Sequence, residues 1–245
     1  MTDLLIQDKG PVRVLTLNRP AKRNALDTAL TSALLEALRT ADGDEDVRCV
    51  VLTGAGPAFC AGADLAEMKD PKDSKWVDRR AELTMQLHLV FSKMITPVVT
   101  AINGAAMGGG AGLAIAGDIA VMAQGAKIGY PETKYGIVAA IVMANLVRQV
   151  GRKAAFELAA LGEPIDARRA LALGMVNRVV PDAGLIAEAM AFADKLAAVE
   201  RPAMAQTKHL FHEVGDLPLE AALKRGRDVN KRMKNFEQIL RKPKK

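Results

Sequence analysis

The stretch "NGAAMGGGAGLAIAGD", Asn103 to Asp118, places three consecutive glycines among small apolar residues. Glycine loses more conformational freedom on folding than any other residue, so three in a row indicate a need for bare backbone. Spacing alone leaves two explanations open: close packing of a helix on a strand, or backbone amides that bind an oxygen of a ligand. The stretch lacks a GxGxxG register and a following Lys-Ser or Lys-Thr, which argues against dinucleotide and P-loop sites.

A second stretch of the chain repeats this pattern. "VVLTGAGPAFCAGADLA" (Val50 to Ala66) aligns without a gap on "VVTAINGAAMGGGAGLA" (Val98 to Ala114), with valine, glycine, alanine and leucine matching along its length. Each copy is typical of a strand, a loop of small residues and the start of a helix. If the two loops face each other, each offers unpaired N–H groups from a first helical turn, where the helix dipole favours negative charge.

Strand and helix signals alternate through the first three quarters of the chain, which predicts an α/β core. Leucines at helical spacing predict a helix that begins near Asp27 or Thr28. After Leu185 the strand signals stop, and three amphipathic helices separated by Pro202 and Pro218 are predicted. The predicted strands are short β-branched runs at 12–18, 47–54 and 97–104.

Composition limits the class of protein. The chain has 245 residues, half of them apolar, which is enough for one sizeable core. Two cysteines, Cys49 and Cys60, form no disulfide framework or metal motif, and we expect both to pack in the core. The amino terminus does not resemble a secretory signal, so a cytoplasmic location is expected. Residues 97–117 carry no charge, but their many glycines and alanines argue against a membrane span.

The formal net charge of +6 is compatible with nucleic acid, an anionic surface or an anionic small molecule as partner. Aromatic residues make up only 4% of the chain, so stacking platforms for single-stranded nucleic acid are scarce. The basic run "RKPKK" at 241–245 is typical of a solvated tail. We therefore expect neither nucleic acid nor a membrane as the main partner.

Four segments together resemble the enoyl-CoA hydratase/isomerase family, also called the crotonase family. The resemblance implies an α/β spiral of repeated β-β-α units, with a catalytic core at 1–184 and a helical trimerisation region at 185–245. It also implies a homotrimer or hexamer and an acyl-CoA thioester substrate of fatty acid metabolism. The segments are "FCAGADL" (59–65), "NGAAMGGGAGLAIAGDIAVMA" (103–123), "IGYPETKYGI" (128–137) and "ARRALALGMVNRVVP" (167–181).

The resemblance assigns two backbone amides to the thioester oxygen. By motif match they are the N–H of Ala63 and the N–H of Gly109. A proton removed or added beside a thioester places negative charge on the carbonyl oxygen, and preorganised donors there lower the barrier. The resemblance thus implies that the glycines serve an oxyanion hole.

The resemblance also assigns an acid/base, Glu132 of the "PE" motif. Hydratases of the family carry a second glutamate two residues after the triple glycine, where this chain has Gly112. A further acid position known in relatives is occupied by Ala139 and Ala140. Only one of the family's carboxylates is therefore present.

A single carboxylate leaves the reaction open. Glu132 alone can shuttle a proton from Cα to Cγ in a 3-enoyl to 2-enoyl isomerisation, while hydration is work that two acids share well. Some relatives with one glutamate still hydrate enoyl-CoA, so both reactions stay open. The alternative class is a non-catalytic acyl-CoA-binding or RNA-associated family member. The acyl chain length cannot be derived from the sequence.

The remaining site residues that the resemblance implies bind coenzyme A. No cofactor is expected beyond the coenzyme A moiety of the substrate, and no metal site is expected, because His209 and His212 have no third ligand nearby. Lys22 and Arg23 are expected at the phosphates, Ala61, Asp64 and Leu65 around the adenine end, and Lys208 at the coenzyme A of a neighbouring subunit.

Overall fold

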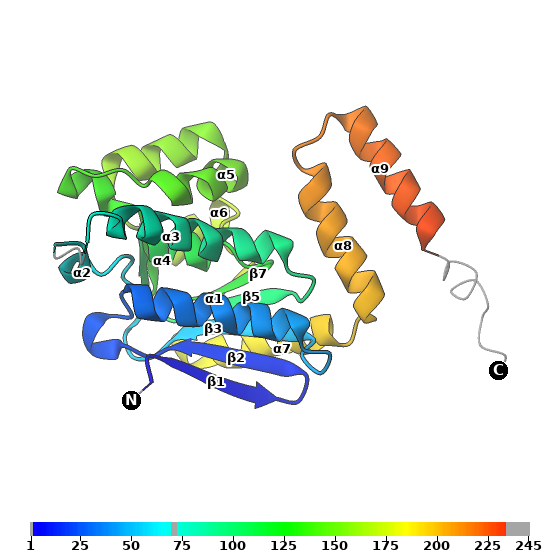
Figure 1. The fold of residues 1–245 in the computed structure, drawn as a ribbon, viewed down its shortest axis with the longest axis horizontal. Coiled ribbons are helices and arrows are strands. Elements are labelled where there is room, and N and C mark those ends of the chain that lie inside the picture. Colours follow the sequence, from blue (N-terminus) through cyan, green and yellow to red (C-terminus); the bar gives the residue numbers. More distant parts are fainter. Residues whose placement is uncertain (1, 70–72, 234–245) are drawn as a thin grey trace.

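A computed structural model describes residues 2–69 and 73–233, and these contain two sheets covered by helices (Figure 1). The larger sheet has the strand order β1-β2-β3-β5-β7-β10, in which β1 and β2 are antiparallel and the other neighbours parallel. Its strands are β1 (Leu4–Lys9), β2 (Val12–Leu17), β3 (Cys49–Gly54), β5 (Val98–Ile102), β7 (Ile119–Ala123) and β10 (Arg178–Val180).

The smaller sheet has the order β4-β6-β8-β9. Its members are β4 (Ala58–Cys60), β6 (Ala105–Met107), β8 (Lys127–Gly129) and β9 (Ile165–Asp166). Of two consecutive strands in the sequence, such as β3 and β4 or β5 and β6, the first thus lies in the larger sheet and the second in the smaller one, and a helix follows. The spiral of β-β-α units is confirmed.

The internal repeat lies side by side in space. Strands β3 and β5 pair in parallel with Val50 opposite Val98 and Val51 opposite Val99, the same pairs that the sequence alignment matches. In the smaller sheet β4 pairs with β6, although a bulge near Ala58 shifts the register. Helix α2 (Leu65–Lys69) begins at the end of the first copy, and α4 (Gly109–Ala114) forms the end of the second.

Helix α1 (Thr28–Gly43) begins where the sequence predicts. The Asp27 carboxylate accepts a hydrogen bond from the Leu30 N–H at 2.8 Å, so it caps the first turn. Its leucines at helical spacing, including Leu34 and Leu38, are fully buried in the core. The other helices of the spiral are α3 (Trp76–Lys93), α5 (Ala140–Leu161) and α6 (Ala167–Ala172), with short 3-10 turns η1 (Pro20–Lys22), η2 (Pro131–Tyr135) and η3 (Asp182–Gly184).

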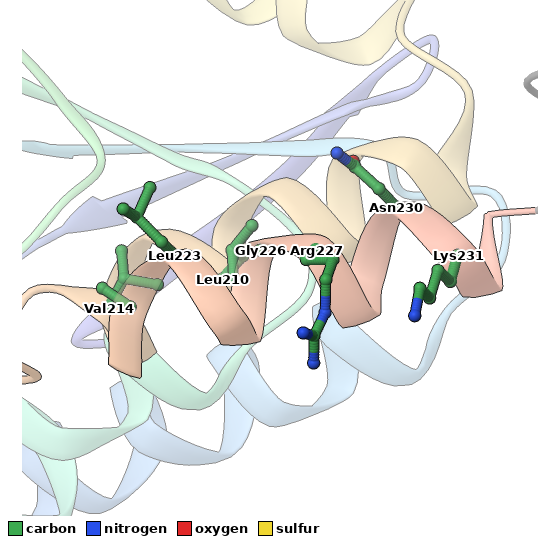
Figure 2. A pocket seen from close by; sticks show the side chains of 8 residues that line it. Leu210, Val214, Leu223, Gly226, Arg227, Asn230 and Lys231 are labelled. Atoms are coloured by element: carbon green, nitrogen blue, oxygen red, sulfur yellow. The ribbon is translucent and has the colours of Figure 1, made fainter. Parts of the chain in front are cut away.

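The three predicted carboxyl-terminal helices are present as α7 (Leu185–Ala197), α8 (Arg201–Val214) and α9 (Leu219–Arg232). Helix α7 packs on β2, β3, β5 and β7, whereas α8 and α9 form a hairpin beside the spiral (Figure 1). Figure 2 shows the groove of about 780 Å³ that α8 and α9 form between them. The basic run at 241–245 and the end of the third predicted helix lie outside the described residues.

The uncharged stretch 97–117 is divided among β5, β6 and α4 and forms part of the core. Among the described residues no helix is both long and apolar enough to cross a membrane. Cys49 and Cys60 are free thiols with no exposed surface, as predicted.

Candidate active site

The loop after β4 presents one of the two predicted amides. Leu26 forms an isolated parallel bridge with Ala63, in which the Leu26 N–H donates to Gly62 O at 2.7 Å and Leu26 O accepts from Asp64 N–H at 3.0 Å. Because neighbouring peptide groups of an extended segment point to opposite sides, the Ala63 N–H points away from Leu26. It has no hydrogen-bond acceptor among the residues that the structure describes.

The turn between β6 and α4 presents the other amide. Gly109 is the first residue of α4, so its N–H has no acceptor within the helix. The preceding N–H, that of Gly108, donates to Gly129 O at 2.8 Å and fixes the turn on β8. Within the described ranges the Gly109 N–H also has no acceptor elsewhere.

The two loops face each other closely. A Cβ placed on Gly62 would lie 3.4 Å from the Gly109 nitrogen, and one placed on Gly109 would lie 4.0 Å from the Ala63 nitrogen. Gly62 has φ of +90°, a conformation that glycine adopts without strain. The two loops that carry the predicted amides are therefore adjacent, and the oxyanion hole stays a prediction.

The three consecutive glycines meet different neighbours. Gly108 has φ of +54°, and a Cβ there would lie 2.8 Å from Glu132 Oε1. At Gly109 a Cβ would have ordinary clearance of 3.9 Å, whereas at Gly110 it would collide with the backbone and Cβ of Cys60. Gly110 thus permits close packing, one of the two explanations left open by the sequence, and Gly108 leaves room for the Glu132 carboxylate.

Glu132 lies in the 3-10 turn η2, with its carboxylate against Gly108. The side chain is half-buried, and its Oε2 has no hydrogen-bond partner in the described part of the chain. Burial raises the pKa of the Glu132 carboxyl above its ordinary value, although the backbone of Glu132 itself partly opposes this. A carboxylate with one oxygen that lacks a partner and with a raised pKa is the arrangement expected of a general base.

The position of the missing second acid is filled. Gly112 is buried in α4, and any Cβ there would collide with Val142 of α5 and approach His88 Cε1 to 2.7 Å. Burial lowers the pKa of His88 to about 4. The sequence analysis missed His88 as a neighbour of the site, because no motif marks it and only the packing of α3 on this region places it there.

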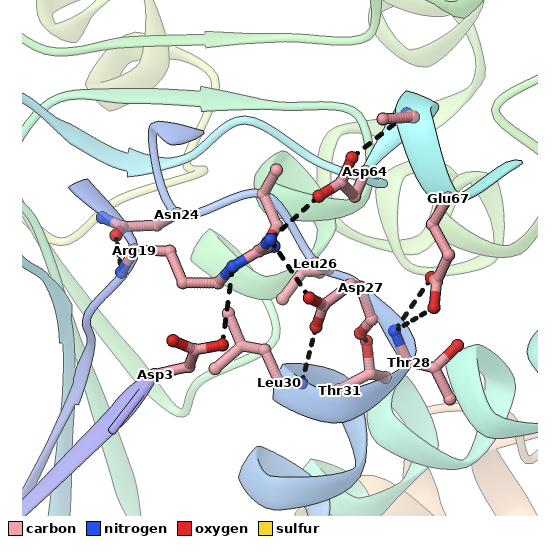
Figure 3. Close-up of polar contacts among 12 residues, drawn as sticks. Asp3, Arg19, Asn24, Leu26, Asp27, Thr28, Leu30, Thr31, Asp64 and Glu67 are labelled. Carbon is pink, nitrogen blue, oxygen red and sulfur yellow. Dashed lines mark hydrogen bonds and ion pairs between the residues drawn. The ribbon is translucent and has the colours of Figure 1, made fainter. Parts of the chain in front are cut away.

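An ionic network holds the Ala63 loop, and the sequence analysis missed most of it. Figure 3 shows the Arg19 guanidinium among the carboxylates of Asp64 at 3.0 Å, Asp27 at 3.1 Å and Asp3 at 3.6 Å. Burial acts to raise the pKa of Asp64, but hydrogen bonds from Arg19 and from the Ala66 N–H hold it below its ordinary value. The charged Asp64 carboxylate is thus paired with the Arg19 guanidinium.

Asn24 fixes the segment before α1 to the connection between β3 and β4. Its buried side-chain amide donates to Ala58 O at 2.8 Å and Ala55 O at 2.9 Å, and its Oδ1 accepts from the Arg19 N–H at 2.9 Å. These bonds hold Asn24 at φ of +56°, a conformation that is uncommon for residues other than glycine. The sequence shows only an asparagine in the segment "NRPAKRNAL", and its burial, which reveals its role, comes from the structure.

The residues expected at coenzyme A are partly brought together. Lys22 and Arg23 are exposed, and Arg23 O accepts a hydrogen bond from the Ala61 N–H at 2.9 Å, so this segment borders the Ala63 loop. Leu65 is exposed at the start of α2. No ligand contact tests these assignments, and they stay predictions.

Lys208 does not fit the role that the resemblance implied. Its side chain is only 3% exposed, and its Nζ donates to Asp118 at 2.8 Å and to Thr96 O at 3.0 Å. His212 lies 3.8 Å from the same Asp118 carboxylate. The ammonium of Lys208 is held within its own chain, because α8 turns it toward the β5–β7 end of the sheet, and the geometry does not support a contact with coenzyme A.

Cys60, at the end of β4, is not placed to act as a nucleophile. Burial raises the pKa of the Cys60 thiol to about 12, so it is not an activated nucleophile. Residues 2–69 and 73–233 contain no group of three histidine, cysteine, aspartate or glutamate side chains able to hold a metal ion.

Comparison with known proteins identifies the class. The family model described as enoyl-CoA hydratase/isomerase matches residues 7–242. A Thermus thermophilus protein named "Putative enoyl-CoA hydratase" is 42% identical over 216 residues, covering 87% of this chain and 85% of the relative. The 2,3-dehydroadipyl-CoA hydratase of Escherichia coli is 34% identical, covering 94% of this chain and 89% of the relative.

Solved structures agree. An enoyl-CoA hydratase of Mycobacterium smegmatis superposes with a TM-score of 0.91 at 35% identity, covering 96% of this chain and 93% of that one. A monofunctional enoyl-CoA isomerase from M. smegmatis superposes with a TM-score of 0.78 at 30% identity, covering 90% and 98%. The chain therefore belongs to the enoyl-CoA hydratase/isomerase family, whose members are enzymes that act on acyl-CoA.

Proposed function

We propose that this enzyme hydrates 2-enoyl-CoA thioesters, with Glu132 as the acid/base and the amides of Ala63 and Gly109 as the oxyanion hole. One observation carries the proposal: the Glu132 carboxylate, whose Oε2 has no partner among the described residues, lies against Gly108, directly before one of two closely placed amides that also have no acceptor there. The names of the more similar relatives, most of them hydratases, favour hydration over other reactions of the family.

In this mechanism the thioester oxygen accepts hydrogen bonds from both amides. Glu132 takes a proton from a water molecule as the water oxygen bonds to C3, and the electrons of the C2–C3 double bond move toward the thioester oxygen. The enolate collapses when protonated Glu132 returns the proton to C2. The amides contribute because the negative charge on oxygen grows in the transition state and is smaller in the ground state.

Isomerisation of 3-enoyl-CoA to 2-enoyl-CoA is the second candidate. One observation favours it: Glu132 is the only carboxylate of the family's catalytic positions that this chain carries. A single base suffices to move a proton from C2 to C4, and no water is needed. The structural similarity to a monofunctional enoyl-CoA isomerase is consistent with this candidate.

Coenzyme A would bind along the segment before α1 and the start of α2. Lys22 and Arg23 supply exposed positive charge for phosphate groups, and the Ala61 loop with exposed Leu65 supplies backbone and apolar surface for adenine. Asp64 holds the Ala61 loop in place through its ion pair with Arg19 and does not need to contact the ligand itself. The proposal carries no role for Lys208 at coenzyme A.

We propose that the subunits associate as a trimer or hexamer through the helical region. Phe211, Leu219 and Leu223 on α8 and α9 are each about two thirds exposed or more. Leu223 also lines the groove of Figure 2 with Leu210 and Val214. Apolar side chains gathered on one hairpin are typical of a surface that another subunit covers.

The absorbance of the conjugated thioester tests the reaction. Hydration decreases it when crotonyl-CoA is the substrate, isomerisation increases it when a 3-enoyl-CoA is the substrate, and a non-catalytic binder changes neither. In Glu132→Gln every turnover should fall by about 10²–10⁴ while coenzyme A affinity is kept, since the amide cannot exchange a proton. Wild-type rates in this variant would contradict the assignment of Glu132.

The pH profile gives an independent check on the same residue. The base must be ionised to accept a proton, so kcat should fall as the pH falls through the pKa of Glu132. Because burial raises that pKa, the decline should be centred above the ordinary 4.5 of a glutamate. A profile that stays flat down to the ordinary value would argue against Glu132 as the base.

A further inference from the structure

Arg80 of α3 is a charged side chain that the packing of the spiral encloses. It shares a helix face with the buried Trp76, because residues four apart lie on one side of a helix. The Arg80 side chain is only 11% exposed, whereas that of its neighbour Arg79 is 59% exposed. Burial lowers the pKa of the Arg80 guanidinium below its ordinary value, while the carboxylates of Glu67 and Asp27 oppose this. A buried guanidinium is costly unless its donors are satisfied, so its partners indicate its role.

Each nitrogen of this guanidinium has a different partner. Nη2 donates to Leu26 O at 2.8 Å, Nη1 donates to Thr84 Oγ1 of α3 itself, and Nε lies 3.6 Å from Glu67 Oε2 of α2. The Glu67 carboxylate also accepts from the Thr28 N–H at the start of α1, at 2.9 Å (Figure 3). The planar guanidinium thus fixes the segment before α1 relative to α2 and α3, which a single ammonium group could not do.

Leu26 transmits this constraint to the Ala63 amide. Its oxygen accepts from Arg80 and, at 3.0 Å, from the Asp64 N–H, and its own N–H donates to Gly62 O at 2.7 Å. The Gly62 oxygen and the Ala63 N–H belong to one planar trans peptide unit, so they point in opposite directions. The position of the Leu26 backbone therefore sets the direction of the Ala63 N–H.

The side chain of Leu26 lies near the second loop as well. A Cβ placed on Gly109 would lie 3.9 Å from Leu26 Cδ1 and 4.0 Å from the Ala63 nitrogen. The preceding carbonyl, Ala25 O, accepts from Arg19 Nη1 at 2.6 Å. Two arginines from different parts of the chain thus hold consecutive carbonyls of the segment that borders both loops.

We propose that Arg80 is a positioning residue of the oxyanion hole, which holds Leu26 so that the Ala63 N–H points at the thioester oxygen. The inference rests on the proposed function, in which this N–H binds the substrate. It applies to hydration and isomerisation alike, because both place negative charge on that oxygen. Without the guanidinium both amides remain, but the direction of one is no longer fixed. The barrier should therefore rise more than the binding weakens.

The test compares Arg80→Met with Arg79→Met. The first variant removes the buried guanidinium and keeps an unbranched side chain, and the second removes an exposed guanidinium that pairs with Asp73 at 2.7 Å. In Arg80→Met, kcat for crotonyl-CoA or a 3-enoyl-CoA should fall about 10- to 100-fold with KM little changed, because a slight misplacement costs about this much. Arg80→Lys, which keeps the charge and can reach one acceptor, should recover part of kcat. Arg79→Met should match the wild type.

The infrared carbonyl band of bound butyryl-CoA, labelled with carbon-13 at the thioester carbon, gives a readout that a loss of stability does not move. This thioester has no double bond to which water could add, and hydrogen bonds to its oxygen lower the stretching frequency. We expect a lowered frequency in the wild-type complex and a partial return toward the frequency of free butyryl-CoA in Arg80→Met. Circular dichroism and thermal unfolding check that each variant is folded.

The outcomes separate the two proposals. A folded Arg80→Met with wild-type kcat, or one that loses kcat while the carbonyl band stays in place, overturns the role of Arg80 and leaves the oxyanion hole intact. Arg80→Lys gives the same comparison if methionine unfolds the chain. A wild-type complex whose band equals that of free butyryl-CoA overturns the oxyanion hole, and the role of Arg80 with it. A shifted band in a wild type that turns over neither substrate overturns the proposed reaction, and the band of Arg80→Met then decides the role of Arg80.

Discussion

The glycine loops of the spiral and the α8–α9 hairpin are both rich in small or apolar residues, but they use them differently. In the loops, Gly108 and Gly110 meet neighbours so closely that a single added carbon would collide. In the hairpin, Leu219 and Leu223 are mostly exposed, and Gly226 has nothing within 4 Å of a built Cβ. The loops pack against neighbours within the chain, whereas the hairpin presents surface that the described residues do not cover.

The largest effect is expected at the loops. Gly109→Pro removes an N–H that has no acceptor within the described residues, at the first helical position, where proline is tolerated. Turnover should fall about 10²–10³-fold if this N–H binds the thioester oxygen. Circular dichroism checks folding, and Gly109→Ala, which keeps the N–H, is the matched control. Near-normal turnover of a folded proline variant would end the oxyanion assignment.

The next effect concerns the one strongly buried charge of the hairpin. Lys208→Met should lower the free energy of unfolding by on the order of 3 kcal/mol, because the mostly buried Asp118 carboxylate loses its nearest positive charge and keeps the Val98 N–H and the more distant His212. Urea denaturation measures this. Lys224→Met breaks an exposed pair with Glu220 and should change stability by only about 0.3–0.5 kcal/mol. Equal effects of the two variants would contradict the anchoring role of Lys208.

Substitutions at one glycine of each region allow the packing of the two regions to be compared directly. Gly110→Ala forces a Cβ into Cys60 and should destabilise the protein by about 1–3 kcal/mol. Gly226→Ala lies inside α9 with open space around it and should stabilise the helix by up to about 1 kcal/mol. Thermal unfolding of both variants gives the signs. The same sign for both would mean that the contrast between the regions is wrong.

The smallest effect on a single chain, and the sharpest test of the uncovered surface, is expected at Leu223. Leu223→Gln should change chain stability by about 0.5 kcal/mol or less, because the side chain is exposed. It should weaken subunit association, which sedimentation equilibrium measures. Ile6→Gln, an exposed aliphatic residue of β1, is the control and should leave the mass unchanged. A wild-type monomer at micromolar concentration would contradict the trimer or hexamer.

Local signals were sufficient for most of the fold. The Asp27 cap, the leucine spacing of α1 and the prolines at the starts of α8 and α9 are short-range features, and the structure bears them out: Pro202 lies in the first turn of α8, and Pro218 is the N-cap of α9. The repeat of 50–66 in 98–114 even predicted neighbours in space, since Val50 and Val98 pair. The division of the chain at residue 185 stays a prediction. Helix α7, which follows this residue, packs on the larger sheet, whereas α8 and α9 form a separate hairpin.

The sequence by itself determined the family, the α/β spiral and the choice of Glu132, Ala63 and Gly109 as site candidates. These depend on motifs and glycine positions that can be recognised within short segments. Only the tertiary structure decided which glycine serves packing, where Lys208 is buried, and that His88 fills the space beside Gly112. These facts depend on contacts between side chains of α3, α5 and α8 and residues that are far from them in the sequence. No short segment of sequence predicts such contacts, since they result from how the helices pack over the two sheets.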